Sequence, residues 1–228
     1  MAQERYYELM AQQLARKIVP GEEIKPFVGN DPNLVGAFAE EQVREFVRAT
    51  VSPLQVSHGA VIRAESHGSG ERLKQLDTII WTPNPLPALF QVGEFALVPW
   101  ENSMGVLEIK SSDYKLEVVE KIEDLSAMTY ELTCGRPRPE ERGIVSVLGV
   151  IVLNRHQISA TALKPLVDQE KAVVLMDWKD EKPQVDDEAL LTFVNFLAGI
   201  RSRAHQLSNV RIQPKTKQRY PDDSRTSI

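Results

Sequence analysis

Asp77, Glu108 and Lys110 have the residue types and the spacing that metal-assisted hydrolysis of a phosphodiester needs. Asp77 interrupts one apolar run, LDTII, and Glu108 interrupts another, VLEIK. Because residues two apart on a strand point to the same face, Glu108 and Lys110 project together while Ile109 points into the opposite layer. If the strands pair so that Asp77 lies beside Glu108, two carboxylates and one ammonium group meet at one spot.

This group of charges suits a divalent cation. Carboxylate oxygens are hard ligands for Mg²⁺, and a bound Mg²⁺ ion activates water and neutralises charge on the phosphate. Lys110 would stabilise the negative charge that develops during the attack, or would steer the attacking water. The alternative is a structural salt bridge between Lys110 and the two acids. In either arrangement, a bound cation or an ion pair offsets the free-energy cost of placing carboxylates in apolar strands.

The patterns around these residues predict an α/β fold. Apolar residues at helical spacing predict four helices, over residues 3–19, 33–51 and 114–132 and from Asp186 onward. Alternating or wholly apolar runs predict five strands, over residues 58–64, 73–81, 104–112, 143–154 and 171–178. The first three form a meander, and the strand–helix–strand passage that follows implies a parallel crossover, so the sheet is mixed.

Two strands have an expected place in this sheet. The run at 143–154 is almost wholly apolar and is expected at the sheet centre, with both faces covered. Residues 95–100 are expected to form a short edge segment, because Pro99 would interrupt a central ladder.

The composition, 42% hydrophobic and 26% charged over 228 residues, is that of a soluble globular protein with one substantial core. We expect a single domain over residues 1–212, with its core at about 34–155, and a polar, disordered tail at 213–228. The first twenty residues lack the apolar stretch of a signal peptide or membrane span, so we expect a cytoplasmic protein. Cys134 is the only cysteine, which excludes a disulfide framework and a cysteine-based zinc site.

The net charge of −5 counts against a nucleic-acid-binding surface, which usually carries a basic stripe. A bound divalent cation would reverse the sign locally, and a partner subunit or a second copy could supply positive surface. Two basic clusters could contact a nucleic-acid backbone, although a solvated turn and a solvated tail explain them equally well. They are Arg136, Arg138 and Arg142, and Lys215, Lys217 and Arg219.

The motifs and their order resemble the PD-(D/E)XK nuclease superfamily. The segments GAFAEEQVREFV, HGAVIRAESHGSGERLKQLDTIIW and VPWENSMGVLEIKSS are similar to a bacterial branch classed as a domain of unknown function, within residues 34–155. The resemblance implies a restriction-endonuclease-like core, a mixed central sheet of order αβββαβ flanked by helices. One departure is Leu76, which stands where the superfamily motif has proline.

The resemblance also implies roles for individual residues. Asp77, Glu108 and the backbone carbonyl of Ile109 would bind Mg²⁺, for which Mn²⁺ can substitute, and Lys110 matches the catalytic lysine. The activity would be cleavage of nucleic acid, with DNA as the expected substrate and defence or mobile-element biology as the context. The alternative is a catalytically inactive member of the fold that binds nucleic acid or protein.

A helix glutamate should assist at such a site. Glu40 and Glu41 flank the apolar stripe of the helix at 33–51 by about equal angles, so periodicity does not choose between them. The resemblance favours Glu40, through the spacing G-x-x-x-E that begins at Gly36. A solvated glutamate on the helix flank is as good an explanation of either residue.

Other residues are weaker candidates. Gln75 shares the face of Asp77 and could contact substrate, and Glu101 could be a supporting acid or the end of a loop. The histidines show no metal-ligand spacing; they are His58, His67, His156 and His205. The sequence contains no phosphate-binding P-loop, zinc-finger pattern or catalytic-serine motif, which disfavours those classes of protein.

Overall fold

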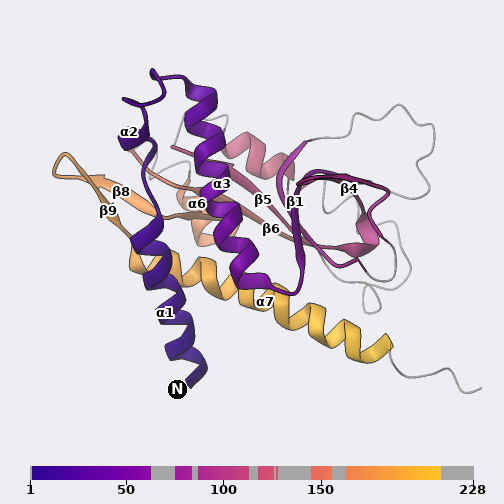
Figure 1. Ribbon diagram of the computed structural model, residues 1–228. Helices are drawn as coiled ribbons and strands as arrows, with labels where there is room; N and C mark the ends of the chain where they lie inside the picture. Colours follow the sequence, from indigo (N-terminus) through magenta and orange to yellow (C-terminus); the bar gives the residue numbers. More distant parts are fainter. Residues whose placement is uncertain are drawn as a thin grey trace, which may run out of the picture.

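Strands that are far apart in the chain form one mixed sheet. The computed structural model describes residues 2–62, 75–83, 87–112, 118–125, 127, 145–155 and 163–211. Among these residues, seven strands pair in the order β3-β4-β1-β2-β5-β6-β7. Figure 1 shows the sheet among its helices. Their bounds are β1 Gln55–Ile62, β2 Leu76–Trp81, β3 Phe90–Val92, β4 Phe95–Pro99, β5 Ser103–Lys110, β6 Ser146–Ile151 and β7 Ala172–Val174. A separate two-stranded ribbon consists of β8 Met176–Lys179 and β9 Lys182–Val185.

The helices flank this sheet on both faces, so the predicted restriction-endonuclease-like α/β class is confirmed. Their bounds are α1 Ala2–Lys17, α2 Gly21–Ile24, α3 Pro32–Val51, α6 Lys164–Asp168 and α7 Asp187–Arg211, with a 3-10 turn η1 at Trp100–Asn102 and a helical segment at 118–125. Buried residues of α1, α3 and α7 form one cluster with one face of β2, β5 and β6. Residues of 118–125 and α6 pack on the other face.

Strand pairing follows the predicted meander and crossover. β1 pairs with β2 and β2 with β5, both antiparallel, and β5 then pairs with β6 in parallel. Since β2 and β5 are antiparallel, the start of β2 meets the end of β5 at one rim of the sheet. This rim receives Asp77, the second residue of β2, and Lys110, the last residue of β5.

Two expected strand positions are wrong. β4 is not an edge, because β3 pairs along its outer side and β1 along its inner side. Pro99 is tolerated because it is the last residue of β4, where the missing N–H costs little. β6 is not central either. Among the described strands, only β7 lies beyond it, and the β3–β4 hairpin extends the opposite side. The run at 171–178 is split between β7 and the ribbon strand β8.

The helix α3 begins and packs as its sequence dictates. The Asp31 carboxylate accepts a hydrogen bond from the backbone N–H of Asn33 at 2.8 Å, and Pro32 occupies the first turn, where its missing N–H is harmless. The apolar stripe is buried at Val35 and from Ala39 onward, whereas Phe38 is half-buried and Leu34 is 52% exposed. α3 is therefore fixed against the sheet along most of its length.

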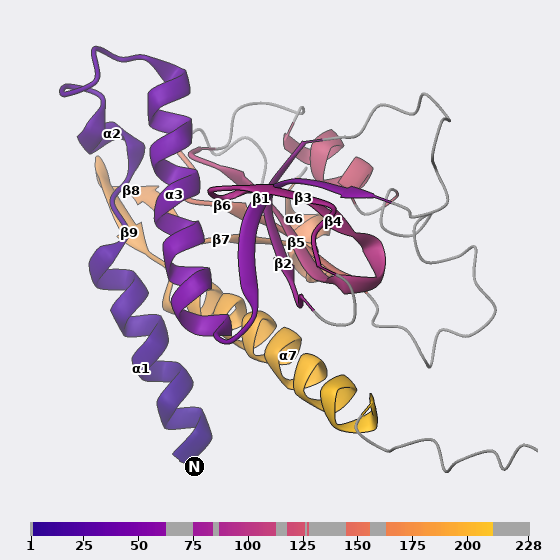
Figure 2. The same cartoon turned by 45° about the vertical axis from the view of Figure 1, so that its right-hand side comes forward.

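The last helix, α7, closes the same layer. Asp186 caps it, accepting from the N–H of Ala189 at 3.0 Å. Its predicted core face is fully buried and comprises Leu190, Phe193, Val194, Leu197 and Ile200. The first helix packs against this last one (Figure 2). Within the described residues, no helix has both the length and the apolar character needed to cross a membrane.

Candidate active site

The structure brings Asp77 beside Glu108. Thr78 pairs with Leu107 across β2 and β5, and the same register continued by one residue sets Asp77 opposite Glu108. The backbone N–H of Ile109 donates to Oδ2 of Asp77 at 2.8 Å. The Ile109 side chain is buried in the opposite layer, in the cluster under α3 and α7. The two carboxylates therefore share one face of the sheet at its rim.

Lys110 completes this group from the last position of β5. Its Nζ lies 2.5 Å from Oε1 of Glu108 and 3.7 Å from Oδ2 of Asp77. All three side chains are mostly buried without being sealed off. The three charges are therefore only partly screened by water, while a part of each side chain still faces solvent.

The structure also distinguishes the two helix glutamates. Glu40 lies close enough to the site that burial, and then the charge of Asp77, raise the pKa of its carboxyl, with Glu108 adding to this and Arg44 and Lys110 opposing it. Glu41 is exposed and forms ion pairs with Arg44 at 3.0 Å and Arg48 at 3.6 Å. Glu40 is thus the helix acid beside the site, and Glu41 is part of an ion-pair network next to it.

The pKa values in the site reflect crowded carboxylates. Burial and the nearby Asp77 raise the pKa of Glu108, against the opposing effect of Lys110. Burial lowers the pKa of Lys110, but the charges of Asp77, Glu108 and Glu40 together outweigh it and the net shift is upward. Lys110 is therefore a firmly charged ammonium. Any further positive charge nearby would stabilise the ionised form of the surrounding carboxyl groups.

The donor set fits a hard divalent cation. Glu40, Asp77 and Glu108 offer only oxygen atoms, which Mg²⁺ prefers. Burial, together with the nearby charge of Asp77, raises the pKa of Glu40 and of Glu108. The arrangement present is that of an ion pair, with Lys110 against Glu108. No three acidic, histidine or cysteine side chains within the described ranges are already grouped as metal ligands.

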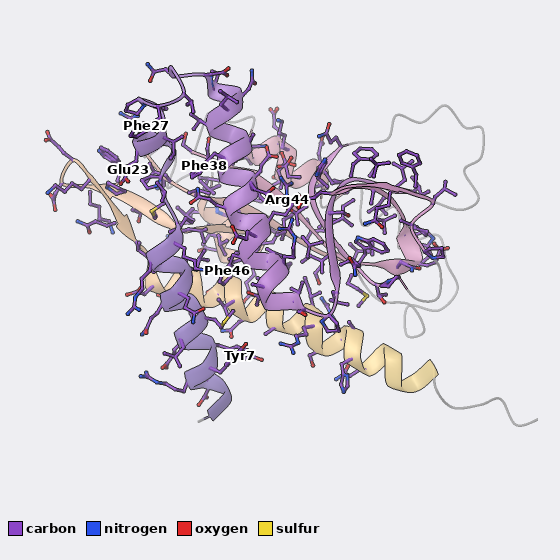
Figure 3. All side chains as sticks on the ribbon, viewed as in Figure 1. Tyr7, Glu23, Phe27, Phe38, Arg44 and Phe46 are labelled. Atoms are coloured by element: carbon purple, nitrogen blue, oxygen red, sulfur yellow. The ribbon has the colours of Figure 1, made fainter. Side chains whose placement is uncertain are left out.

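Arg44 is a site residue that the sequence reasoning missed. It lies one turn after Glu40 on α3, on the side of the helix that adjoins the strands (Figure 3). Its guanidinium donates to the backbone carbonyl of Asp77 at 2.5 Å. The sequence contained one signal, because Arg44 directly follows Val43 within an apolar stripe. A buried arginine needs polar partners, so this position pointed to a contact.

The weaker candidates are spread along the chain. Gln75 is exposed and directly precedes β2, two residues before Asp77. Glu101 belongs to η1, near the far end of β2, where the Thr82 N–H donates to the Asn102 carbonyl at 3.0 Å. The ring of His58 contacts that of Phe95 at 5.8 Å between centroids. Several candidates lie outside the described residues, namely His67, His156, the arginines at 136, 138 and 142, and the tail at 213–228.

A second feature, a cavity of about 720 Å³, lies at the opposite end of β2 from Asp77. Its lining comes from the start of α1, the turn between α3 and β1, the end of β2 and the second half of α7. The charged or aromatic residues in it are Tyr6, Tyr7, Arg201 and His205, and no carboxylate is among the described residues that line it. In a protein of net charge −5, this is a locally basic and aromatic surface.

Comparison with known proteins shows the fold. No family model and no curated protein matches the sequence. The chain is similar to the cAAA-bound structure of NucC from E. coli MS115-1, with 11% identity, a TM-score of 0.55, and coverage of 87% of this chain and 90% of that one. It is also similar to cAAA-bound NucC from P. aeruginosa ATCC27853, at 12% identity, a TM-score of 0.52 and the same coverage.

Proposed function

We propose that the protein is a metal-dependent nuclease that hydrolyses phosphodiester bonds in nucleic acid, with DNA as the substrate to test first. The observation that supports this most directly is the meeting of Asp77, Glu108 and Lys110 at the rim of the sheet, with Glu40 beside them. The resemblance in motif order and the restriction-endonuclease-like fold agree with it. A role in defence against foreign DNA is the context we infer from that resemblance.

Each residue of the site has its own proposed role in the reaction. Asp77, Glu108 and the carbonyl of Ile109 would hold Mg²⁺ or Mn²⁺, which would supply an activated water and charge neutralisation. The Lys110 ammonium would hydrogen-bond the oxygen that gains negative charge in the transition state. Glu40, with its raised pKa, would accept a proton from the attacking water or support the metal. The Ile109 N–H keeps the Asp77 carboxylate aimed at the site.

Nicking of plasmid DNA with added Mg²⁺ tests the proposal. Asp77→Ala, Glu108→Gln and Lys110→Ala should each abolish nicking while the circular dichroism spectrum stays native. Glu40→Gln should slow nicking strongly, whereas Glu41→Gln, at the neighbouring helix position, should not. Undiminished nicking in the first three variants would exclude this site as its source.

A catalytically inactive module is the competing interpretation, and the net charge of −5 favours it. Metal binding separates the two. Calorimetry with Mn²⁺ should give saturable binding to the wild-type protein and none to Asp77→Ala. A folded wild-type protein that binds no Mn²⁺ at millimolar concentration would favour the module.

A second candidate function is suggested by the cavity lined by Tyr6, Tyr7, Arg201 and His205. Its volume lies in the range of small-molecule sites. Tyrosine rings and basic groups, with no carboxylate among the described lining residues, suit an anionic ligand that carries a flat ring. We propose that this cavity binds such a ligand. The compound to test first is cAAA, with which both similar structures were solved.

Calorimetry with cAAA tests this second function. Arg201→Ala should weaken binding at least tenfold. Arg16→Ala, which removes an exposed arginine of α1 that does not line the cavity, should leave binding unchanged. Absence of binding to the wild-type protein, or equal losses in the two variants, would count against the cavity as the site.

A further inference from the structure

Arg44 is a buried cation that contacts Asp77 from another element. Its side chain is 7% exposed, and its NH1 group donates to the Asp77 carbonyl at 2.5 Å. Its Nε and NH2 groups donate to one oxygen of Glu41, at 3.1 Å and 3.0 Å. Glu94, in the turn between β3 and β4, lies 3.8 Å from Nε. One guanidinium thus connects α3, β2 and the hairpin turn.

The contact falls on the part of Asp77 that decides where its carboxylate points. The guanidinium is a rigid fork of donors, so its hydrogen bond to the carbonyl fixes the peptide plane after Asp77. At the other end of the same residue, Oδ2 accepts from the Ile109 N–H. Asp77 is therefore held at both its backbone and its side chain. Without the backbone contact, the Asp77 carboxylate would shift whenever the start of β2 shifts.

We infer that Arg44 is a positioning residue, which holds the Asp77 backbone so that the carboxylate faces Glu108 and Lys110. The inference rests on the proposed nuclease function, because it concerns how that site is kept ready. Arg44 is not proposed to contact substrate. Besides holding Asp77, its charge lowers the pKa of Glu40. A displacement of about 1 Å in such a group costs on the order of 100-fold in rate.

The chain contains a matched control one turn further along α3. Arg48 also forms ion pairs with Glu41 and Glu94, at 3.6 Å and 2.7 Å, and its side chain is 36% exposed. The two arginines therefore share both acidic partners, whereas the hydrogen bond to Asp77 comes from Arg44. Any effect that arises from the network in general should follow from substitution of either arginine.

Single-turnover cleavage of a labelled DNA duplex measures the effect. Arg44→Ala should lower the cleavage rate about 10- to 100-fold, as loss of a supporting contact typically does, with little change in DNA affinity. Arg44→Lys should fall between Arg44→Ala and the wild type. Arg48→Ala should stay within about threefold of the wild type. Guanidinium ion at millimolar concentration should restore part of the rate to Arg44→Ala, whereas sodium ion at equal ionic strength should not.

Hydrogen exchange at the Ile109 amide gives a second measure that needs no activity. Arg44→Ala should speed exchange at this amide at least tenfold, since the Asp77 acceptor is released, and Arg48→Ala should not. The inference would be overturned if the wild-type protein cleaves DNA and Arg44→Ala has the same cleavage rate and the same Ile109 exchange rate as the wild type. Equal losses in the two alanine variants would do the same. A wild-type protein that cleaves nothing, with the exchange effect intact, would refute the proposed function and leave the hold on Asp77 standing.

Discussion

At the scale of single residues, the site holds three carboxylates, Glu40, Asp77 and Glu108, and one ammonium, Lys110. Burial, and then the nearby charge of Asp77, raise the pKa of Glu108, so in the folded protein this carboxyl keeps its proton to a higher pH than in the unfolded chain. The folded state then binds more protons between the ordinary value of 4.5 and the raised one. The free energy of unfolding therefore falls as the pH rises through that window.

We predict that Glu108→Gln stabilises the protein at pH 8, because it removes a charge that folding forces out of water and against Asp77. The gain should shrink toward pH 4, where the carboxyl is protonated in both states. Urea unfolding at the two pH values measures it. Glu45→Gln, which removes an exposed charge of α3, should change stability by less than about 0.5 kcal/mol. A less stable Glu108→Gln at pH 8 would mean that the ion pair with Lys110 outweighs the burial of the carboxyl.

The same residues show what sequence reasoning can reach. The two-residue period of a strand is enough to place Glu108 and Lys110 together, and the antiparallel pairing then adds Asp77. Helical periodicity could not choose between Glu40 and Glu41, because both lie at similar angles to the apolar stripe. It could not find the partner of Arg44, because that partner is a backbone carbonyl 33 residues further along the chain.

At the scale of elements, long periodic segments were predictable and short ones were not. The helices α3 and α7 and the strand β5 carry their patterns over many residues and were found. The turn of α2 and the strands β3 and β9 were missed, since each has at most four residues and is held by its neighbours. The missing β3 caused the wrong placement of β4, because an unseen edge strand makes its neighbour look like the edge.

Two glycines give opposite predictions for one kind of substitution. Gly59 in β1 has φ of 137°, and a Cβ there would lie 2.1 Å from the backbone oxygen of Ala96. Gly59→Ala should destabilise by roughly 1–3 kcal/mol from crowding, with backbone strain in addition. Gly36 is helical in α3 with open space around the added Cβ. Gly36→Ala should stabilise by about 0.5–1 kcal/mol.

Urea unfolding of the two alanine variants tests this pair, and each serves as the control for the other. Plasmid nicking by Gly36→Ala adds a check on the resemblance, because Gly36 begins the G-x-x-x-E spacing. Loss of stability in both variants would contradict the open space described around Gly36.

At the scale of the whole molecule, one edge of the sheet is apolar and open. The side chains of β3 are exposed, with Phe90 at 52% and Val92 at 63%, and β3 pairs only with β4 among the described strands. Unpaired strand edges of this kind are templates for association between chains. We predict that the wild-type protein associates increasingly with concentration, and that Val92→Lys reduces this association without slowing cleavage.

Light scattering across a concentration series measures the association. Lys182→Ala, on the separate ribbon, is a control that should scatter as the wild type does. Unchanged association in Val92→Lys would show that copies meet through another surface.

The packing of the first helix against the last has a consequence during synthesis. Residues of α1, α3 and α7 share one buried cluster, so the layer over β2, β5 and β6 is incomplete until α7 has been made. Asp77, Glu108 and Lys110 are translated well before α7, and chains grow by about 5–20 residues per second. A nascent chain would thus carry every site residue for some seconds without the layer that supports them. The proposed nuclease would therefore become active only after α7 has been made and has packed into this layer.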